Sequence, residues 1–295
     1  MTLEQLRLFV AVAEREHVTA ASRALHVTQS AVSAAIAALE ERHGVKLFHR
    51  VGRGINLTEA GRLFLPQARA VLARAAMAQT VLEEVGGLRR GTLRLVASQT
   101  IAAYWLPPIL VAFRGLYPDV EVDLAISNTL DAASRVRDGS MELGIVEGLV
   151  EDPALAQWRV GEDHLTIIQV GSDVPQKMGR EWLCSAQWVM REPGSGTRAA
   201  LEEYLGQLGV TPRDMHVSLV LPSNEAVRTA IEAGAGVGAL SSLVVAPALL
   251  AGTLHAVPQT LKTRAFYGLR HKERYQSRAA DALLALIEQQ KHKVE

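Results

Sequence analysis

Residues 19–50, TAASRALHVTQSAVSAAIAALEERHGVKLFHR, determine the fold of the N-terminal part of this 295-residue chain. The stretch predicts two short helices joined by a tight turn and followed by a wing with a basic tip. Thr28 is a suitable N-cap for the second helix, because its hydroxyl can accept a backbone N–H of the next turn. The apolar residues expected to face inward recur at helical spacing. In the first helix they are Ala20, Ala21, Ala24 and Leu25, and in the second they are Val32, Ile36 and Leu39.

The outer face of the second predicted helix carries short polar side chains at Gln29, Ser30 and Ser33. Such side chains can hydrogen-bond to base edges or phosphates when the N-terminal end of a helix points into a major groove. We therefore predict that Thr28, Gln29, Ser30 and Ser33 contact DNA. An amphipathic helix pair without any nucleic-acid partner would show the same apolar periodicity, so the periodicity alone leaves that alternative open.

A wing with two arginines is expected directly after the second helix. Leu47 and Phe48 anchor its first strand, and RVGRG at residues 50–54 makes the turn. Arg53, at the tip, is predicted to enter a minor groove, whose negative potential attracts arginine. Arg50 is predicted to contact phosphate. The alternative for both arginines is a solvated basic loop.

Together with its continuation GRGINLTEAG at residues 52–61, this stretch resembles the N-terminal winged helix-turn-helix of LysR-type transcriptional regulators. The similarity runs from about residue 3 to residue 61 nearly without gaps. It is carried by the N-cap, the small polar face, LEERHGVKLFHR at residues 39–50 and LTEAG at residues 57–61, in that order. The resemblance implies a regulator that binds double-stranded DNA as a homodimer or, as is usual in the family, as two dimers, and that meets RNA polymerase.

One position departs from the family's pattern. Many members carry a basic residue directly after the recognition-helix serine, where this chain has Ala34. Ala37 and Ala38 extend the bare surface. We therefore expect base recognition to depend on Gln29, Ser30 and the wing, with fewer hydrogen bonds in each half-site.

The chain carries 31 Lys and Arg and 31 Asp and Glu, a balance that argues against general polyanion binding. The charges are not evenly distributed, because residues 1–91 hold 12 basic and 8 acidic residues and the first Asp is Asp119. A modest positive excess suits a DNA-facing module, since phosphate neutralisation supplies much of the affinity. Charged residues interrupt the N-terminus where a signal peptide would need an apolar run, and no apolar stretch is long enough to span a membrane. A cytoplasmic protein is expected.

A long helix is predicted to begin after Thr58, its N-cap, and to continue to about residue 88. Such a helix would be about 45 Å long, too long to bury itself in a small domain, so we expect it to pair with a second copy of the chain. Apolar residues at seven-residue spacing, with others between them, describe a coiled-coil seam. These residues are Phe64, Val71, Ala78 and Val85, with Ala68, Ala75 and Leu82 at the intermediate positions. The resemblance agrees, since the family uses this segment as a dimerising linker helix.

Beyond the glycine-rich residues 86–91, strands and helices are predicted to alternate, which indicates parallel α/β layers. The predicted strands are residues 92–98, 120–127, 141–147, 164–170, 188–192, 217–223, 236–242 and 264–272, and the predicted helices are residues 101–116, 129–138, 197–208, 224–234 and 277–290. Two α/β lobes joined by crossing strands would make a hinged cleft like that of periplasmic binding proteins, and the resembled family carries such an effector domain. The expected fold class is α+β overall.

Three domains are therefore expected. They are a winged helix-turn-helix at residues 1–58, a linker helix and hinge at residues 59–91, and a two-lobed effector-binding domain at residues 92–295. The first lobe of that domain would comprise about residues 92–161 and 268–295, and the second about residues 162–267.

Polar residues that follow the predicted strands mark a ligand site. In an open α/β sheet, ligands collect outside the carboxyl ends of the strands, often at helix N-termini. The candidate effector-binding residues are Ser98, Gln99, Thr100, Thr129, Ser195, Thr197, Arg198 and Asn224. The groups at residues 98–100 and 192–198, one from each lobe, are expected to face each other across the cleft. The alternative is that Ser, Thr and Asn at these positions only cap helices.

The EPGSGTR stretch at residues 192–198 suggests the chemistry of the effector. Its glycines let the backbone approach a ligand, its hydroxyls can donate hydrogen bonds, and Arg198 can pair with an anion. The stretch resembles family members that sense small oxyanions or phosphorylated metabolites. A small or anionic effector is therefore expected, and no cofactor.

Two other function classes remain as alternatives. A solute-binding module is supported by the two-lobe pattern alone and has no use for the N-terminal 90 residues. An enzyme in the cleft would need paired carboxylates, a metal-ligand spacing or a catalytic triad, and the sequence offers none of these patterns. The one cysteine, Cys184, excludes an intramolecular disulfide, and none of the nine histidines forms an i, i+4 metal pair. We expect no catalytic and no metal-binding residues.

Overall fold

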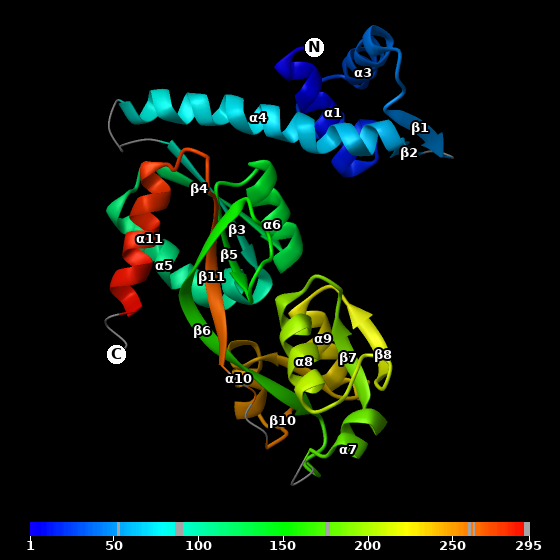
Figure 1. Ribbon diagram of the computed structural model, residues 1–295, viewed down its shortest axis with the longest axis vertical. Helices are drawn as coiled ribbons and strands as arrows, with labels where there is room; N and C mark the ends of the chain where they lie inside the picture. Colours follow the sequence, from blue (N-terminus) through cyan, green and yellow to red (C-terminus); the bar gives the residue numbers. More distant parts are fainter. Residues whose placement is uncertain (52–53, 86–90, 175–177, 259–260, 262, 292–295) are drawn as a thin grey trace. The chain divides into compact units, whose positions relative to one another are not determined.

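The computed structural model describes residues 1–51, 54–85, 91–174, 178–258, 261 and 263–291. The chain forms two compact units, Met1–Val85 with Asp138–Met141, and Gly86–Arg137 with Glu142–Glu295. Figure 1 shows the elements of both units. Within the described ranges, none of the helices has both the length and the hydrophobicity needed to cross a membrane.

The first unit is a winged helix-turn-helix followed by a long helix. Its elements are α1 (Leu3–Arg15), α2 (Val18–Ala24), α3 (Gln29–His43), β1 (Phe48–Val51), β2 (Gly54–Leu57) and α4 (Glu59–Val85). α1 begins with a capping box, in which Thr2 and Gln5 each accept the backbone N–H of the other. β1 and β2 pair antiparallel and form the wing. The predicted order of two helices, a turn and a wing is confirmed.

An aromatic cluster lies at the centre of the first unit's core. The ring of Phe9 lies 5.4 Å from that of Phe48 in β1 and 5.0 Å from that of Phe64 in α4. The inner face predicted for α3 packs into the same core. Its buried residues are Val32, Ile36 and Leu39.

The inner face of α2 differs from the prediction. Ala21 is buried, but Ala20 and Ala24 are exposed, and Ser22 takes an inner position instead. Ser22 can be buried because its hydroxyl donates a hydrogen bond to the carbonyl of Thr19 at 3.0 Å. A polar residue therefore stands where the periodicity predicted only apolar ones.

The first residues of the predicted dimer seam belong to this core. Phe64 packs against it and Ala68 is buried in it, because the N-terminal turns of α4 cover α1. The surface that α4 leaves for a second chain therefore begins further along. Of the remaining seam residues, Val71, Ala78 and Leu82 are exposed, Ala75 is half-buried, and the side chain of Val85 lies outside the described residues.

The second unit consists of two α/β lobes joined by two long strands, β6 (Leu155–Gln169) and β11 (Thr263–His271), as Figure 1 shows. The first lobe contains β3 (Gly91–Ser98), the π-helical turn η1 (Ile101–Trp105), α5 (Leu106–Leu116), β4 (Val120–Ser127), α6 (Thr129–Asp138), β5 (Leu143–Glu147) and α11 (Arg278–Lys291). The second contains α7 (Arg180–Ser185), β7 (Gln187–Arg191), α8 (Gly196–Gln207), β8 (His216–Leu221), α9 (Asn224–Glu232), β9 (Gly238–Ser241), α10 (Ser242–Leu250) and β10 (His255–Ala256).

Parallel strands place the predicted polar residues at one edge of the first lobe. β3 runs parallel to β4 over its whole length and parallel to β5 on its other side. β11 pairs antiparallel with both β5 and β6, and β6 continues into the second lobe, where it pairs antiparallel with β9 and β10. Because β3, β4 and β5 are parallel, the residues that follow them gather at the same end of the sheet.

Each lobe has its own apolar core. Phe113 and Phe266 are fully buried in the first lobe. In the second lobe the buried indole of Trp188 donates a hydrogen bond to the carbonyl of Leu183 at 2.9 Å. The expected architecture of two α/β lobes joined by crossing strands is thus confirmed.

Two predicted elements differ in detail, and three elements were not predicted. The helix predicted at residues 101–116 is divided into η1 and α5, because Pro107 and Pro108 have no N–H to donate to the preceding turn. β6 begins well before the predicted residue 164, since its first part pairs with β11. The two helices α7 and α10 and the short strand β10 were not predicted at all.

Candidate functional site

The outer face of α3 presents the residues predicted to contact DNA. Gln29, Ser30 and Ser33 are exposed. Thr28 caps the helix, with its hydroxyl accepting the N–H of Ala31 at 3.2 Å, and the same hydroxyl lies 3.0 Å from that of Ser30. The cap occupies part of the hydrogen-bonding capacity of Thr28, so the other three residues supply most of the polar surface.

Thr19 orients Gln29, a role that the sequence did not indicate. Its hydroxyl donates a hydrogen bond to Oε1 of Gln29 at 3.1 Å, from α2 to the first turn of α3. The amide group of Gln29 is thereby held at the N-terminal end of the helix, with its two N–H donors left for an acceptor outside the protein. The helical spacing of apolar residues in α2 does not indicate such a contact.

A hollow of about 570 Å³ lies between α3 and the wing and is bordered by basic side chains. Its lining includes His17, Gln29, Ser33, Lys46, His49 and Arg50. Arg50 is exposed and has no ion-pair partner among the described residues, so its guanidinium can bind an external anion. Arg53, the other predicted wing contact, lies outside the described residues.

Glu40 fixes the start of the wing. Its carboxylate accepts hydrogen bonds from Nζ of Lys46 at 2.7 Å and from the N–H groups of Leu47 at 2.8 Å and Phe48 at 3.2 Å. Burial raises the pKa of Glu40, but these hydrogen bonds outweigh it and hold the pKa below its ordinary value. The wing is thus attached to α3 by an ionised side chain.

The middle of α3, between Ser33 and Leu39, exposes only alanine side chains. Ala34, Ala37 and Ala38 are all exposed. Methyl groups can contact a thymine methyl but cannot donate or accept hydrogen bonds. The middle of α3 therefore offers no hydrogen-bonding side chains on this surface, and the exposed polar ones lie in its first two turns and at its C-terminal end, at residues 41–43.

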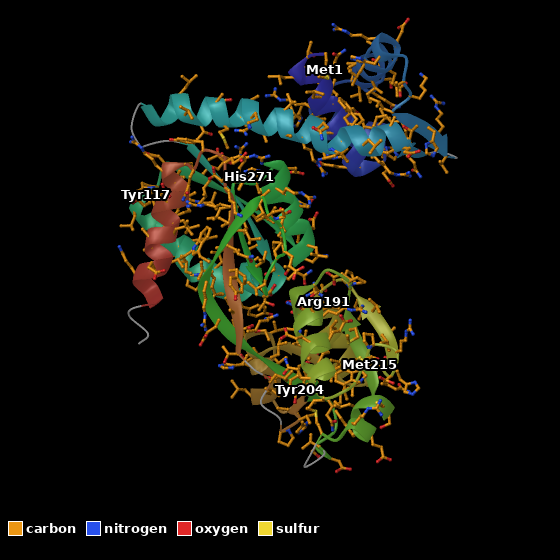
Figure 2. All side chains as sticks on the ribbon, in the orientation of Figure 1. Met1, Tyr117, Arg191, Tyr204, Met215 and His271 are labelled. Atoms are coloured by element: carbon orange, nitrogen blue, oxygen red, sulfur yellow. The ribbon has the colours of Figure 1, made fainter. Side chains whose placement is uncertain are left out.

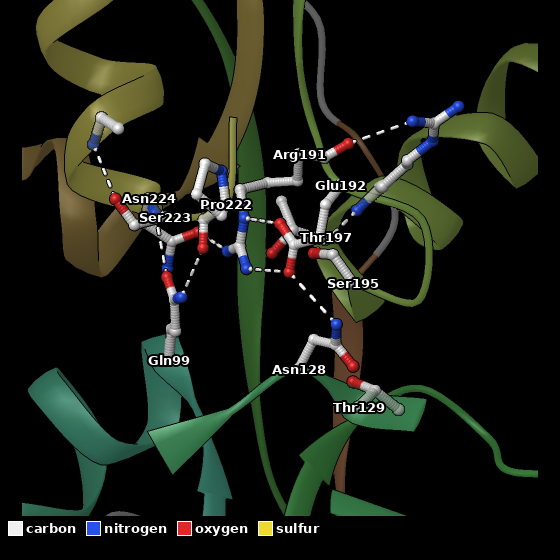
Figure 3. A network of polar contacts seen from close by, with 12 residues as sticks. Gln99, Asn128, Thr129, Arg191, Glu192, Ser195, Thr197, Pro222, Ser223 and Asn224 are labelled. Carbon is white, nitrogen blue, oxygen red and sulfur yellow. Dashed lines mark hydrogen bonds and ion pairs between the residues drawn. The ribbon is translucent and has the colours of Figure 1, made fainter. Parts of the chain in front are cut away.

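In the second unit, the predicted effector residues meet across the two lobes, but in a different pairing from the one expected. Gln99 donates to the carbonyl of Pro222 at 2.8 Å and accepts the N–H of Asn224 at 3.0 Å. Nδ2 of Asn224 donates to the hydroxyl of Thr100 at 3.1 Å. The residues after β3 therefore face the start of α9, not the predicted 192–198 segment (Figure 3).

The 192–198 segment instead faces the residues that follow β4. Asn128 donates to Oε1 of Glu192 at 3.3 Å, and the N–H of Leu130 donates to the carbonyl of Gly194 at 3.2 Å. A Cβ atom at Gly196 would lie 2.6 Å from the carbonyl oxygen of Glu147 and 2.7 Å from the hydroxyl of Thr129. Only glycine permits this approach of the two lobes.

Arg191 is the cation at the centre of the contact between the lobes. It lies at the end of β7, on the side of the second lobe that faces the first (Figure 2), and its side chain is only 3% exposed. Its guanidinium binds both carboxylate oxygens of Glu192, at 2.8 and 2.9 Å, and also Oδ1 of Asn224. Burial raises the pKa of Glu192, but the hydrogen bonds and charge of Arg191 lower it below its ordinary value overall.

Arg198, the cation that the sequence favoured for an anion, is already engaged. Its guanidinium binds Oε1 of Glu202 at 2.7 Å and the carbonyl of Arg191 at 3.1 Å. Ser195 caps α8 by accepting the N–H of Arg198 at 3.4 Å, so the capping alternative describes Ser195 well. Arg198 stays a predicted effector-binding residue, and Arg191, which is more deeply buried between the lobes, is a second candidate anion ligand.

A second buried arginine, Arg264, holds the crossing strands to α8. It binds both carboxylate oxygens of Asp163, at 2.8 and 2.5 Å, donates to the hydroxyl of Thr197 at 2.9 Å and lies 3.8 Å from Glu147. Burial lowers the pKa of Arg264, but the two carboxylates outweigh it and raise the pKa, so the guanidinium stays charged. Thr197 is therefore part of an internal network.

A hollow of about 620 Å³ adjoins this network. Its lining includes Thr129, Glu147, Ser195, Arg198, Tyr204 and Arg264. The buried hydroxyl group of Tyr204, in this lining, has no hydrogen-bond partner among the described residues. The buried hydroxyl of Ser98 also has none among them, but Ser98 does not line the hollow. Within the same residues, no group of three or more His, Cys, Asp and Glu is arranged to hold a metal ion.

Sequence reasoning missed Arg191 and Arg264, and one signal could have found them. Arg191 follows the largely apolar residues 188–190 and Arg264 precedes the largely apolar residues 265–269, and a charge buried beside such a run requires a partner. Their partners lie next in sequence for Arg191 and about a hundred residues away for Arg264. The sequence therefore indicates that these residues are special, but not which residues they bind.

Two family models match the chain. Residues 3–62 match the bacterial regulatory helix-turn-helix protein model of the lysR family, and residues 86–291 match the LysR substrate binding domain. The chain is 34% identical over 284 residues to the uncharacterized HTH-type transcriptional regulator YeiE of Escherichia coli K12, covering 95% of this chain and 94% of that protein.

Other relatives agree with this result. A probable RuBisCO transcriptional regulator of Nostoc is 31% identical over 289 residues, covering 95% of this chain and 86% of that protein. The fold is similar to that of full-length CbnR in complex with its target DNA, with a TM-score of 0.67 and 21% identity over 98% of this chain and 99% of that one.

Proposed function

The chain belongs to the LysR family of transcriptional regulators, and from this premise we propose that it binds double-stranded DNA as a homodimer under the control of a small anionic effector. Membership of this family replaces the two alternatives, a solute-binding module and an enzyme. The observation that carries the effector proposal is the buried guanidinium of Arg191 between the two lobes, among polar side chains from both.

The N-terminal end of α3 is the proposed base-reading element. Gln29, Ser30 and Ser33 are exposed there, and Thr28 supports them as the cap. Arg50 would contact phosphate, which is consistent with its place in the lining of the hollow between α3 and the wing. Arg53 would enter the minor groove. CbnR, whose fold is similar, has been solved with its target DNA.

The exposed part of α4 is the proposed dimer surface. Val71 is 43% and Leu82 is 76% exposed, and Ala78 lies between them on the same helix. Exposed apolar side chains at this spacing are stabilised when a second helix covers them. Assembly of two dimers and a contact with RNA polymerase complete the proposal.

Effector binding would act by changing how the lobes meet. For this to be regulation, the ligand must favour one DNA-bound arrangement over another. The contacts of Thr100 and Gln99 with residues 222–224 join the lobes without covalent constraint, so a ligand that competes for these groups changes the arrangement. No cofactor is required by this proposal.

DNase footprinting tests the proposal on the DNA immediately upstream of the protein's own gene, with and without pooled metabolites. We expect a protected stretch spanning several helical turns that metabolites shorten or shift. Absence of protection at low salt would contradict the DNA-binding part of the proposal.

A single substitution tests the effector part of the proposal. Thr100→Val removes the hydroxyl that Asn224 binds, so we expect the footprint to persist and the metabolite response to disappear. Thr92→Val, at an exposed position of β3, the strand that precedes Thr100, should leave both unchanged. A full response in the Thr100→Val variant would show that the effector binds elsewhere.

A further inference from the structure

Glu192 is bound in the way that the carboxylate of a ligand would be. Its two oxygens lie 2.8 and 2.9 Å from Nε and Nη2 of Arg191, the paired geometry that arginine forms with carboxylate, sulfate or phosphate groups. One of the same oxygens also accepts a hydrogen bond from Asn128 of the other lobe at 3.3 Å. A single anionic group thus connects the two lobes (Figure 3).

The two partners of this ion pair differ in their freedom to move. The side chain of Arg191 is 3% exposed and is also held by Asn224, whereas that of Glu192 is 22% exposed. Glu192 follows the last residue of β7, so its side chain is not fixed by the sheet. The carboxylate can therefore leave for solvent, but the guanidinium cannot.

We propose that Glu192 is an internal occupant of an anion subsite, and that an oxyanion group of the effector displaces it from Arg191 and Asn128. This inference rests on the proposed effector function and adds the chemistry and the competition at that site. Displacement keeps the buried guanidinium paired at every stage, since one carboxylate, sulfate or phosphate group replaces another. The bond between Glu192 and Asn128 of the first lobe is lost, and the effector takes over the connection.

The charge of Glu192 supports its replacement by an oxyanion. Because Arg191 lowers the pKa of Glu192, the side chain is ionised at neutral pH and neutralises the arginine without any ligand. A carboxylate attached to the adjacent residue is present at a high effective concentration. The intact chain should therefore bind oxyanions weakly, and removal of the internal carboxylate should strengthen binding.

Titration of the full-length chain with sodium sulfate, at constant ionic strength maintained with chloride, tests the inference by calorimetry. Glu192→Gln keeps the size of the side chain but removes its charge, so we expect sulfate to bind at least tenfold more tightly than to the unmodified chain. Glu232→Gln is the matched control, because it removes the same charge from a carboxylate of similar exposure, paired with Arg228 in α9, and this pair includes no candidate effector residue. It should leave the sulfate affinity unchanged.

A second substitution locates the bound sulfate. Asn128 caps α6 by accepting the N–H of Asp131 at 3.0 Å, and Asn128→Asp keeps that acceptor while replacing the donor to Glu192 by a negative oxygen. In the Glu192→Gln background, Asn128→Asp should abolish the tenfold gain. A gain that persists would place the sulfate elsewhere and overturn the inference.

Different results would contradict the inference about Glu192 and the proposed function. If folded Glu192→Gln protein binds sulfate no more tightly than the unmodified chain, Glu192 does not compete with oxyanions and the inference is wrong. A footprint that still responds to metabolites in the unmodified chain would then leave the regulator and its effector intact. Melting curves in the absence of sulfate establish that each variant is folded.

Discussion

The surface of α3 that we propose faces DNA and the cleft of the second unit differ in how their polar side chains are partnered. Gln29, Ser33 and Arg50 point outward, and Arg50 has no ion pair among the described residues. In the cleft, Thr100 and Asn224 are buried and bound to each other. The first surface can bind its partner directly, whereas the second must exchange internal hydrogen bonds for external ones, which makes it suited to switching.

The largest expected effect would break the internal network of the cleft unit. Asp163→Asn leaves the buried guanidinium of Arg264 with Glu147, at 3.8 Å, as its only carboxylate partner among the described residues. We expect the free energy of unfolding to fall by about 3 kcal/mol or more, as when one partner of a buried ion pair is removed. Urea denaturation measures this. Glu162→Gln, at the adjacent exposed pair with Arg159, should cost less than about 1 kcal/mol, and equal effects would show that burial is irrelevant.

A smaller effect is expected where the two lobes approach most closely. Gly196→Ala places a Cβ atom 2.6 Å from the backbone oxygen of Glu147, so the lobes must separate, at a cost of about 1–3 kcal/mol. The metabolite response should be lost with it. Gly206→Ala in the same helix has nothing within 4 Å of its Cβ and should stabilise the chain by about 0.5–1 kcal/mol. Thermal unfolding of both variants decides whether close contact or helix propensity determines the result.

On the DNA-facing surface, the effects should appear in binding rather than in stability. Arg50→Ala removes an unpaired charge, so we expect affinity to fall severalfold on the operator and on unrelated DNA alike. The slope of log affinity against log salt should decrease by about 1. Fluorescence anisotropy over a range of salt concentrations measures both. Arg114→Ala removes the same charge from an exposed position of α5 in the second unit, and a similar loss there would refute a local phosphate contact.

The smallest effect concerns the orientation of Gln29. Thr19→Val removes the hydrogen bond to Oε1 of Gln29, worth about 0.5–1.5 kcal/mol. We expect a loss of up to about tenfold in affinity for the operator, with no change for unrelated DNA. Thr19→Ser retains the hydroxyl and should restore operator binding. A loss on both kinds of DNA would mean that Thr19 supports the fold of α2 rather than base recognition.

The first unit could be predicted closely because its determinants are local. The cap at Thr28 and the spacing of Val32, Ile36 and Leu39 lie within one helix, and both are found in the structure. The prediction was less accurate for α4, whose apolar residues pack on α1 in its first turns and are exposed further along. Phe64 and Ala68 fit a dimer seam by spacing, yet they pack on α1, and spacing cannot distinguish a partner helix of the same chain from one of another.

For the cleft, the sequence predicted which polar residues lie at strand ends and helix starts, but not which of them bind each other across the lobes. Ser98, Thr100, Thr129 and Asn224 do lie at strand ends or helix starts. Which of them meet depends on the order of strands in each sheet and on the orientation of the lobes, and neither is encoded locally. The pair of Arg191 and Glu192 was also unpredictable, since neighbouring side chains in a strand point to opposite faces. It forms because Glu192 lies just beyond the strand.

The bare alanine surface of α3 has a consequence for the information content of the operator. With Ala34, Ala37 and Ala38 exposed, base pairs opposite the middle of α3 meet only methyl groups, which accept a thymine but reject few alternatives. Selection from random duplexes should therefore yield short, degenerate half-sites, whose consensus is confined to the bases facing Gln29 and Ser30. The distance between half-sites, which the dimer fixes, should be the most strictly conserved property of the selected DNA.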